Sequence, residues 1–373
     1  MARFTYPLFA AALAGAAWTA PIWACPARAA SFSCALAKSP MEVAICSDDK
    51  VSKADGAMAG VYQDALAKLS PNGRITLRDS QRNFLRYVTD LCGPGGRPLD
   101  ADRNPWRWAK GSRPSDPVLV GQCLAEQFAK RASDLRGAVL PVGGHVFLVT
   151  EYHRVRAAAP LQVGDITVHD VVTETKSLIQ IDAPKSKAEA DWNQASKDWL
   201  DDTMDSPNSE TENHNFEAEE LDVDARMELV SASPELIVVQ MGVSTYWKSR
   251  AHPQWQREVR NWSLPLGRAL KPDDFLDANK PWDRALTAVA QANLKSAVDP
   301  PDDALAGKIS SIDNIDHWRL TPAGLEIVFD PYELGGYLSA AKTSVPWSAI
   351  RPLMRPDAPF DPAALQLSPI KTW

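Results

Sequence analysis

The position of the cysteines is the feature that most restricts how this chain can fold. One of the five, Cys25, lies near the N-terminus, and the others are Cys34, Cys46, Cys92 and Cys123, so none follows residue 123. They form no C-x-x-C pair and have no histidine between them, which favours disulfides over a zinc site. Four cysteines permit three pairings; shorter loops favour Cys34 with Cys46 and Cys92 with Cys123, and the other pairings stay open. Two disulfides in the first third of the chain predict an oxidising compartment.

The N-terminal segment predicts export. Met1-Ala2-Arg3 is positively charged, residues 8–18 are apolar, and Ala27-Arg28-Ala29 offers small residues at a cleavage site, so residues 1–29 are typical of a secretory signal peptide. The apolar run is shorter than the roughly 20 residues of a membrane span. The alternative is lipidation of Cys25, although Trp23 stands where a lipobox usually has a small residue. We expect a periplasmic or secreted protein without a transmembrane anchor after cleavage.

Length and composition restrict the class of protein. At roughly 150 residues per domain, 373 residues predict two or three domains. A hydrophobic content of 45% and a charged content of 23% are typical of a folded, globular chain. The net charge of -7 argues against a nucleic-acid-binding protein, since phosphate neutralisation needs a basic surface.

Residues 31–139 predict a helical domain. Ser39 and Pro40 fit the N-cap and first position of a short helix, further helices are expected over 57–69 and 118–135, and another ends before the glycines at 93–96. In the helix that follows Ser70-Pro71-Asn72-Gly73, these apolar residues are expected to face inward: Ile75, Leu77, Phe84, Leu85, Val88 and Leu91.

A family resemblance rests on residues in this region. The runs Ser31-Phe32-Ser33-Cys34 and Ser39 to Cys46, then Asp90-Leu91-Cys92-Gly93 and Cys123-Leu124, resemble the LprI-like domain, named after a bacterial lipoprotein lysozyme inhibitor. The chain departs from the family at Phe84, where Trp is usual, and in a long insert between Cys92 and Cys123. The resemblance implies a secreted, disulfide-bonded helical bundle.

Residues 141–373 predict a second domain of the α+β class. Strand patterns occur at 145–156, 236–247 and 325–329, and helical patterns at 188–200 and 282–297. Because strands and helices do not alternate as in parallel βαβ units, we expect an antiparallel sheet with packed helices.

The last third resembles a second family. Ala251-His252-Pro253, Asn261 to Leu264, Leu320 to Leu325 and Phe329 to Leu334 are similar to the extracellular RsiV-type domain of lysozyme-sensing anti-sigma factors. Ser249 and Arg250 replace glycines that commonly precede the Ala-His-Pro element. No sigma-binding segment is recognised, so the resemblance implies an exported module and no signalling role.

The sequence offers no catalytic site, and we expect no enzyme activity, cofactor or metal. None of the six histidines forms an i, i+4 pair, and no Gly-x-Ser-x-Gly elbow occurs. His252, Tyr332 and Glu333 are candidates for binding a partner; the alternative is a structural role in turns.

Charge is segregated along the chain and indicates the type of partner. Residues 182–224 hold 14 acidic residues and 3 lysines, a net charge of -11, whereas residues 31–139 carry +4. The acidic stretch could meet a cationic lysozyme, or be a solvated loop. Its candidate partner-binding residues are Glu217, Glu219, Glu220, Asp222 and Asp224.

The sequence therefore predicts an exported envelope protein that binds or inhibits lysozyme or a related cell-wall-directed partner. The alternatives are an envelope enzyme that acts on peptidoglycan or a polysaccharide, and a non-catalytic envelope scaffold.

Overall fold

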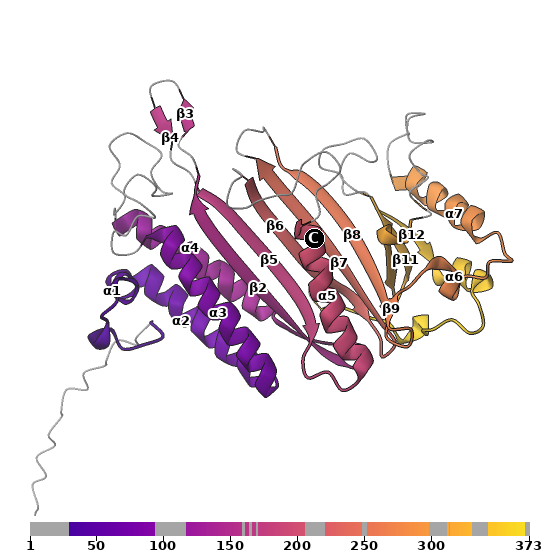
Figure 1. Ribbon diagram of the computed structural model, residues 1–373, viewed down its shortest axis with the longest axis horizontal. Coiled ribbons are helices and arrows are strands. Elements are labelled where there is room, and N and C mark those ends of the chain that lie inside the picture. The colour runs from indigo at the N-terminus through magenta and orange to yellow at the C-terminus, as the bar shows by residue number, and fades with distance from the viewer. Residues whose placement is uncertain are drawn as a thin grey trace, which may run out of the picture.

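The computed structural model describes residues 30–93, 117–158, 161–163, 166–168, 171–205, 221–247, 252–297, 312, 314–329 and 342–369. The predicted signal peptide, including Cys25, lies outside these residues. In the described part the fold is α+β: helices near the N-terminus lie beside a large mixed sheet, and a smaller antiparallel sheet follows (Figure 1). Among the helices described, none has the length and apolar character to cross a membrane.

The N-terminal part is helical, as expected. A short 3-10 helix, η1 (Cys34–Leu36), precedes α1 (Pro40–Ser47), α2 (Asp49–Ala67), α3 (Pro71–Cys92) and α4 (Pro117–Arg136). Ser39 caps α1 in a capping box with Glu42, and Gly93, at φ 60°, ends α3 in the left-handed conformation that glycine adopts easily. The pairing Cys34–Cys46 and Cys92–Cys123 is confirmed, with Cα–Cα distances of 5.6 and 5.7 Å.

The packing of α3 corrects part of the prediction. Leu77, Phe84 and Val88 are buried in the helical core, but Ile75 is 55% and Leu85 38% exposed. At 100° per residue, Ile75 lies on the opposite side of the helix from Phe84, so the expectation that Ile75 and Leu85 face inward was wrong.

The large sheet begins directly after α4 and has the strand order β1-β2-β5-β6-β7-β8-β9, with β13 beside β6. Gly143 and Gly144, both at positive φ, form the turn between β1 and β2. The strands of this sheet are β1 (Val139–Val142), β2 (His145–Ala157), β5 (Val171–Ile181), β6 (Leu221–Ala232), β7 (Leu236–Trp247), β8 (Gln254–Ser263), β9 (Arg268–Ala269) and β13 (Gln366–Leu367). A separate small hairpin consists of β3 (Leu161–Val163) and β4 (Ile166–Val168).

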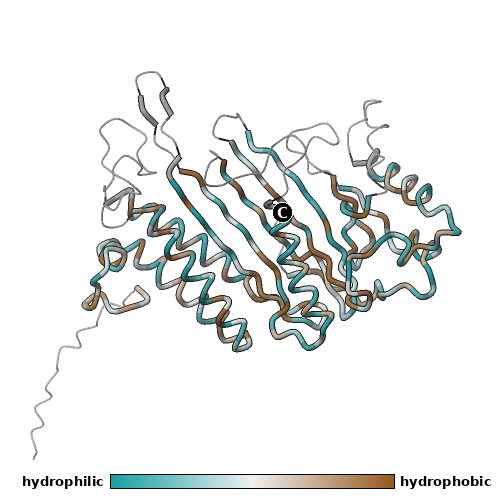
Figure 2. Tube along the Cα trace, viewed as in Figure 1, coloured by the Kyte–Doolittle hydropathy of each residue, from teal (hydrophilic) through white to brown (hydrophobic). Residues whose placement is uncertain are grey.

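The prediction of an antiparallel sheet was wrong for one pair of strands. β5 and β6 are parallel over Glu174 to Lys176, because α5 (Lys187–Asp205) lies between them in the chain and returns it to the same end of the sheet. Buried Trp192 and Trp199 of α5 belong to the core of the large sheet. Along the long strands hydrophobic and hydrophilic residues alternate in several stretches (Figure 2).

The C-terminal part adds a second layer with its own core. β10 (Trp318–Thr321), β11 (Gly324–Val328) and β12 (Lys342–Pro346) form an antiparallel sheet, accompanied by α6 (Pro272–Phe275), α7 (Trp282–Ala297) and α9 (Trp347–Ile350). Its core includes Phe275, Trp318 and Trp347, as well as Leu236 and Val238 of the large sheet.

The helical part covers an edge of the large sheet. In the described residues β1 pairs only with positions 145–148 of β2, and beyond them α3 lies against β2. Ser80 Oγ donates to the carbonyl of Glu151 at 2.7 Å, and Asn83 accepts from His153 N at 2.7 Å and donates to His153 O at 3.1 Å. These side chains take the place of a neighbouring strand. The division into domains 31–139 and 141–373 stays a prediction, because this packing joins the two parts.

Candidate functional site

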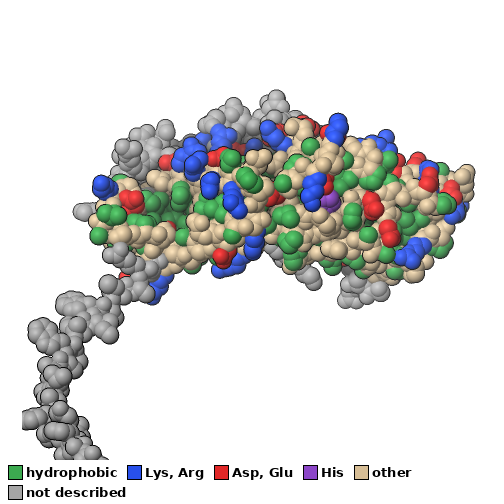
Figure 3. Space-filling view, turned by 90° about the horizontal axis from the view of Figure 1, so that it is seen from below, with side chains coloured by type: hydrophobic (Ala, Val, Ile, Leu, Met, Phe, Trp, Pro, Cys, Tyr) green, Lys and Arg blue, Asp and Glu red, His purple; other side chains and the backbone are tan. Residues whose placement is uncertain are grey.

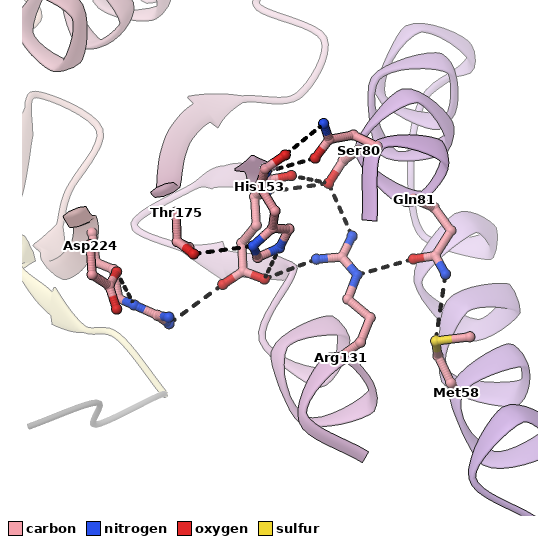
Figure 4. Close-up of polar contacts among 10 residues, drawn as sticks. Met58, Ser80, Gln81, Arg131, His153, Thr175 and Asp224 are labelled. Carbon is pink, nitrogen blue, oxygen red and sulfur yellow. Dashed lines mark hydrogen bonds and ion pairs between the residues drawn. The ribbon is translucent and has the colours of Figure 1, made fainter. Parts of the chain in front are cut away.

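Arg131 of α4 is the centre of a polar cluster between the helices and the large sheet. Its side chain is 3% exposed, and Nη1 donates to Glu151 Oε2 of β2 at 3.0 Å. The same guanidinium donates from Nε to Gln81 Oε1 and from Nη2 to Ser80 Oγ, each at 3.0 Å (Figure 4). Three of the five N–H groups of a buried cation thus have fixed acceptors on two other elements.

The cluster continues across the sheet from Glu151. Arg226 Nη1 of β6 lies 3.5 Å from Glu151 Oε1, and Arg226 Nε donates to Asp224 Oδ1 at 2.7 Å. His153 Nε2 lies 3.7 Å from Glu151 Oε2, and His153 Nδ1 lies 3.2 Å from Thr175 Oγ1 of β5. The two oxygens of Glu151 therefore face two different arginines, Arg131 on α4 and Arg226 on β6.

The local sequence explains this geometry. Side chains alternate between the two faces of a strand, so Glu151 and His153 share a face of β2 with Phe147 and Val149. Their neighbours in register on β5 are Ser177 and Thr175. On α3, Tyr87 stacks on the His153 ring with centroids 4.9 Å apart.

The environment shifts the pKa values of Glu151, His153 and Asp134. Burial alone would raise the pKa of Glu151, but His153 and the charges of Arg131 and Arg226 hold it well below its usual range. Burial lowers the pKa of His153 despite the Glu151 carboxylate, so its ring is neutral at pH 7. Burial, followed by the charge of Glu151, raises the pKa of Asp134 to about 6.

A cavity of about 600 Å³ opens beside this cluster. It is lined by the end of α4 with Arg131 and Asp134, by strands of the large sheet with Leu140, Val149 and Ile179, and by Ser368 near the C-terminus. Its size is within the range of small-molecule sites. Asp134 is the carboxyl group there that exchanges a proton near neutral pH, and its carboxylate could pair with a cationic group.

The structure brings some of the residues predicted from sequence to this cluster. Asp224 pairs with Arg226, and Asp222 Oδ1 accepts from Thr173 N at 2.7 Å. Burial, together with the charges of Asp222 and Asp224, raises the pKa of Tyr87 to about 12.

The other predicted site residues lie elsewhere. His252 is exposed just before β8, and β7 lies between β8 and the strand of Asp222 and Asp224. Five further candidates fall outside the described residues: Glu217, Glu219, Glu220, Tyr332 and Glu333. In the part of the chain that is described, no group of three or more His, Cys, Asp or Glu side chains could hold a metal ion.

Sequence reasoning missed the cluster itself. Arg131, Arg226 and Asp134 look like ordinary surface charges in the sequence, because Glu151, which lies among them, is distant from each along the chain. One signal was present: Glu151 and His153 continue the alternation of Phe147 and Val149, which places two polar residues on an apolar face.

Comparisons with known proteins bear on the N-terminal part. No curated protein matches the chain. Two solved structures of the DUF3298 family are similar to part of it: one from Bacteroides fragilis (11% identity, TM-score 0.41, covering 57% of this chain and 95% of that one) and one from Pseudomonas aeruginosa (12%, 0.40, 59% and 96%). Residues 34–135, which contain both disulfides, α1 to α3 and all but the last residue of α4, match the model of the family described as lysozyme inhibitor LprI.

Proposed function

We propose that this protein is an exported, non-catalytic envelope protein that binds or inhibits a lysozyme or a related cell-wall-directed partner. The observation that carries the proposal is the match of residues 34–135 to lysozyme inhibitor LprI. We also propose that the last third is an RsiV-type module. That resemblance points to the same type of ligand.

The way in which the helical region is held supports a binding role. Two disulfides link its segments, and the contacts of Arg131, Ser80 and Asn83 fix α3 and α4 to β2. A surface that is rigid before binding loses less conformational entropy when a partner docks.

Electrostatic attraction is the proposed means by which the partner is recruited. The acidic stretch 182–224 would steer a cationic lysozyme, with Asp222 and Asp224 at its end fixed beside the cluster. Raising the salt concentration from 50 to 300 mM shortens the Debye length from about 14 Å to about 6 Å, so association should slow.

The direct test is the clearing of a peptidoglycan suspension by lysozyme in the presence of the purified protein. Slower clearing, with binding that weakens at high salt, supports the proposal. Clearing without added lysozyme would instead show an enzyme. No effect and no binding at micromolar concentration would leave the scaffold interpretation.

Charge-matched variants test the role of the acidic stretch. Glu217→Gln, Glu219→Gln and Glu220→Gln together should slow association. The control is Asp273→Asn, Asp283→Asn and Asp357→Asn, which removes three exposed carboxylates from the C-terminal part and should bind like the wild type. Equal association rates for the two triple variants would exclude steering by this stretch.

A further inference from the structure

The exposed face of α3 carries an unusual run of charge. At 100° per residue, positions four apart drift by 40°, so four arginines fall within an arc of about 120° over about 18 Å of helix. All four are exposed: Arg74, Arg78, Arg82 and Arg86. In the view from below, Lys and Arg side chains gather over the helical half of the molecule (Figure 3).

The same arc carries exposed apolar side chains and no carboxylate. Ile75 and Leu85, 55% and 38% exposed, project from α3 between the arginines. The acidic residues of this helix, Asp79 and Asp90, lie just beyond the arc at about 140° and 160° from Arg74. The Asp79–Arg82 pair spans 2.9 Å, but its side chains are 55% and 72% exposed, so it offsets little of the charge.

The opposite side of α3 prevents the helix from turning this face away. Leu77, Phe84 and Val88 are buried in the helical core, Asn83 is bonded to the backbone of β2, and Cys92 is linked to Cys123. Arg74 Nε also donates to Leu66 O of α2 at 2.9 Å. The arginines therefore present their charge in a fixed direction.

We propose that this face of α3 docks on a membrane surface rich in anionic lipid. Guanidinium groups bind phosphate with several N–H donors, and the row of four matches a plane of lipid headgroups. The interleaved Ile75 and Leu85 favour a lipid surface over a soluble polyanion, because apolar side chains gain free energy only where they reach acyl chains. A cationic lysozyme would be repelled by this face and would have to bind elsewhere on the protein. The inference therefore does not rest on the proposed lysozyme binding.

The test is co-sedimentation of the purified exported protein with vesicles of phosphatidylcholine, with or without about 30% phosphatidylglycerol. We expect binding to the anionic vesicles alone. Arg78→Gln, Arg82→Gln and Arg86→Gln together should weaken it on the order of 100-fold, since each basic residue contributes about fivefold. The charge-matched control, Lys185→Gln, Lys187→Gln and Lys197→Gln, alters exposed lysines in and just before α5 and should bind like the wild type.

A second variant separates lipid from other anions. Ile75→Ser with Leu85→Ser should reduce vesicle binding while leaving retention on dextran sulfate unchanged, and circular dichroism should show that both variants stay folded. Equal binding by the arginine and lysine variants would overturn the proposal. So would retention on dextran sulfate without vesicle binding, which would assign the face to a soluble polyanion.

Discussion

Arg131 Nη1 of α4 lies 3.0 Å from Glu151 Oε2 of β2, and the two side chains are only 3% and 8% exposed. The ion pair joins the disulfide-bonded helices to the sheet at a point that water barely reaches. At such a depth the loss of one partner costs more than the pair itself contributes, because the remaining charge is left buried.

Glu151→Gln should therefore lower the free energy of unfolding by about 3 to 5 kcal/mol. The control is Asp79→Asn, which removes the exposed partner of Arg82 and should change stability by less than about 0.5 kcal/mol. Urea denaturation measures both. If the two variants unfold at the same urea concentration, the burial of Arg131 does not require the charge of Glu151.

Asn83→Ala should cost about 1 to 3 kcal/mol, because it leaves the N–H and C=O groups of His153 without their side-chain partner. Hydrogen exchange at the His153 amide should speed up as well. Asn72→Ala, an exposed change on the same helix, is the matched control and should leave that amide protected. Unchanged exchange in Asn83→Ala would refute the edge pairing.

Asp134 should make stability fall as pH rises from about 4 to about 6. Its pKa is about 6 in the folded protein and 3.8 as the ordinary value, so in this window the folded state holds more protons than the unfolded state. Ionisation then costs on the order of 3 kcal/mol, at about 1.4 kcal/mol for each pKa unit. Asp134→Asn should lack this loss and be more stable than the wild type at pH 7.

The comparison between the wild type and Asp134→Asn isolates the effect of Asp134 on the pH dependence of stability. The lowered pKa of His153 has the opposite effect, since stability is lost as pH falls below the ordinary histidine value, but it acts in both proteins. Thermal melts at pH 4, 5, 6 and 7 measure the difference. A constant gap across this range would show that the pKa of Asp134 is not raised.

Removal of the two disulfides should have unequal effects. The bridges span sequence separations of 12 and 31 residues, so loop-closure entropy predicts losses of about 3 and about 4 kcal/mol for the paired Cys→Ser variants. Labelling of the native protein should find none of the four cysteines free. A reactive thiol at Cys92 or Cys123 would contradict the pairing.

Local signals in the sequence predicted much of the fold. Ser39 and Pro40 mark the start of α1 because capping depends only on adjacent residues, and the pattern at 236–247 gives β7 with the correct ends. No strand was predicted over β5 or β6, and their parallel direction depends on where α5 packs, which a local stretch of sequence does not show. The apolar spacing around Ile75 was misleading, because the sequence alone does not distinguish an exposed isoleucine from a buried one.

The polar cluster could not be derived in the same way. Arg131 and Glu151 are 20 residues apart and Ser80 is 71 residues from Glu151, so their proximity arises only when α3 and α4 dock on β2. Glu151 and His153 lie on the same face of β2 as Phe147, which indicated that two polar side chains there needed partners. The sequence did not show which residues those partners are.

The contact of Asn83 with β2 also bears on self-association during folding, because it covers an edge of the sheet to which another chain could add a strand. Until α3 docks, the outer edge of β2 beyond Val149 is open in the described part of the chain, and another copy could add a strand to it. The helix that closes this edge ends at Cys92, whose bond to Cys123 ties it to α4. Oxidation of one cysteine pair thereby favours closure of the edge, and a chain that folds in a reducing environment is exposed to aggregation for longer.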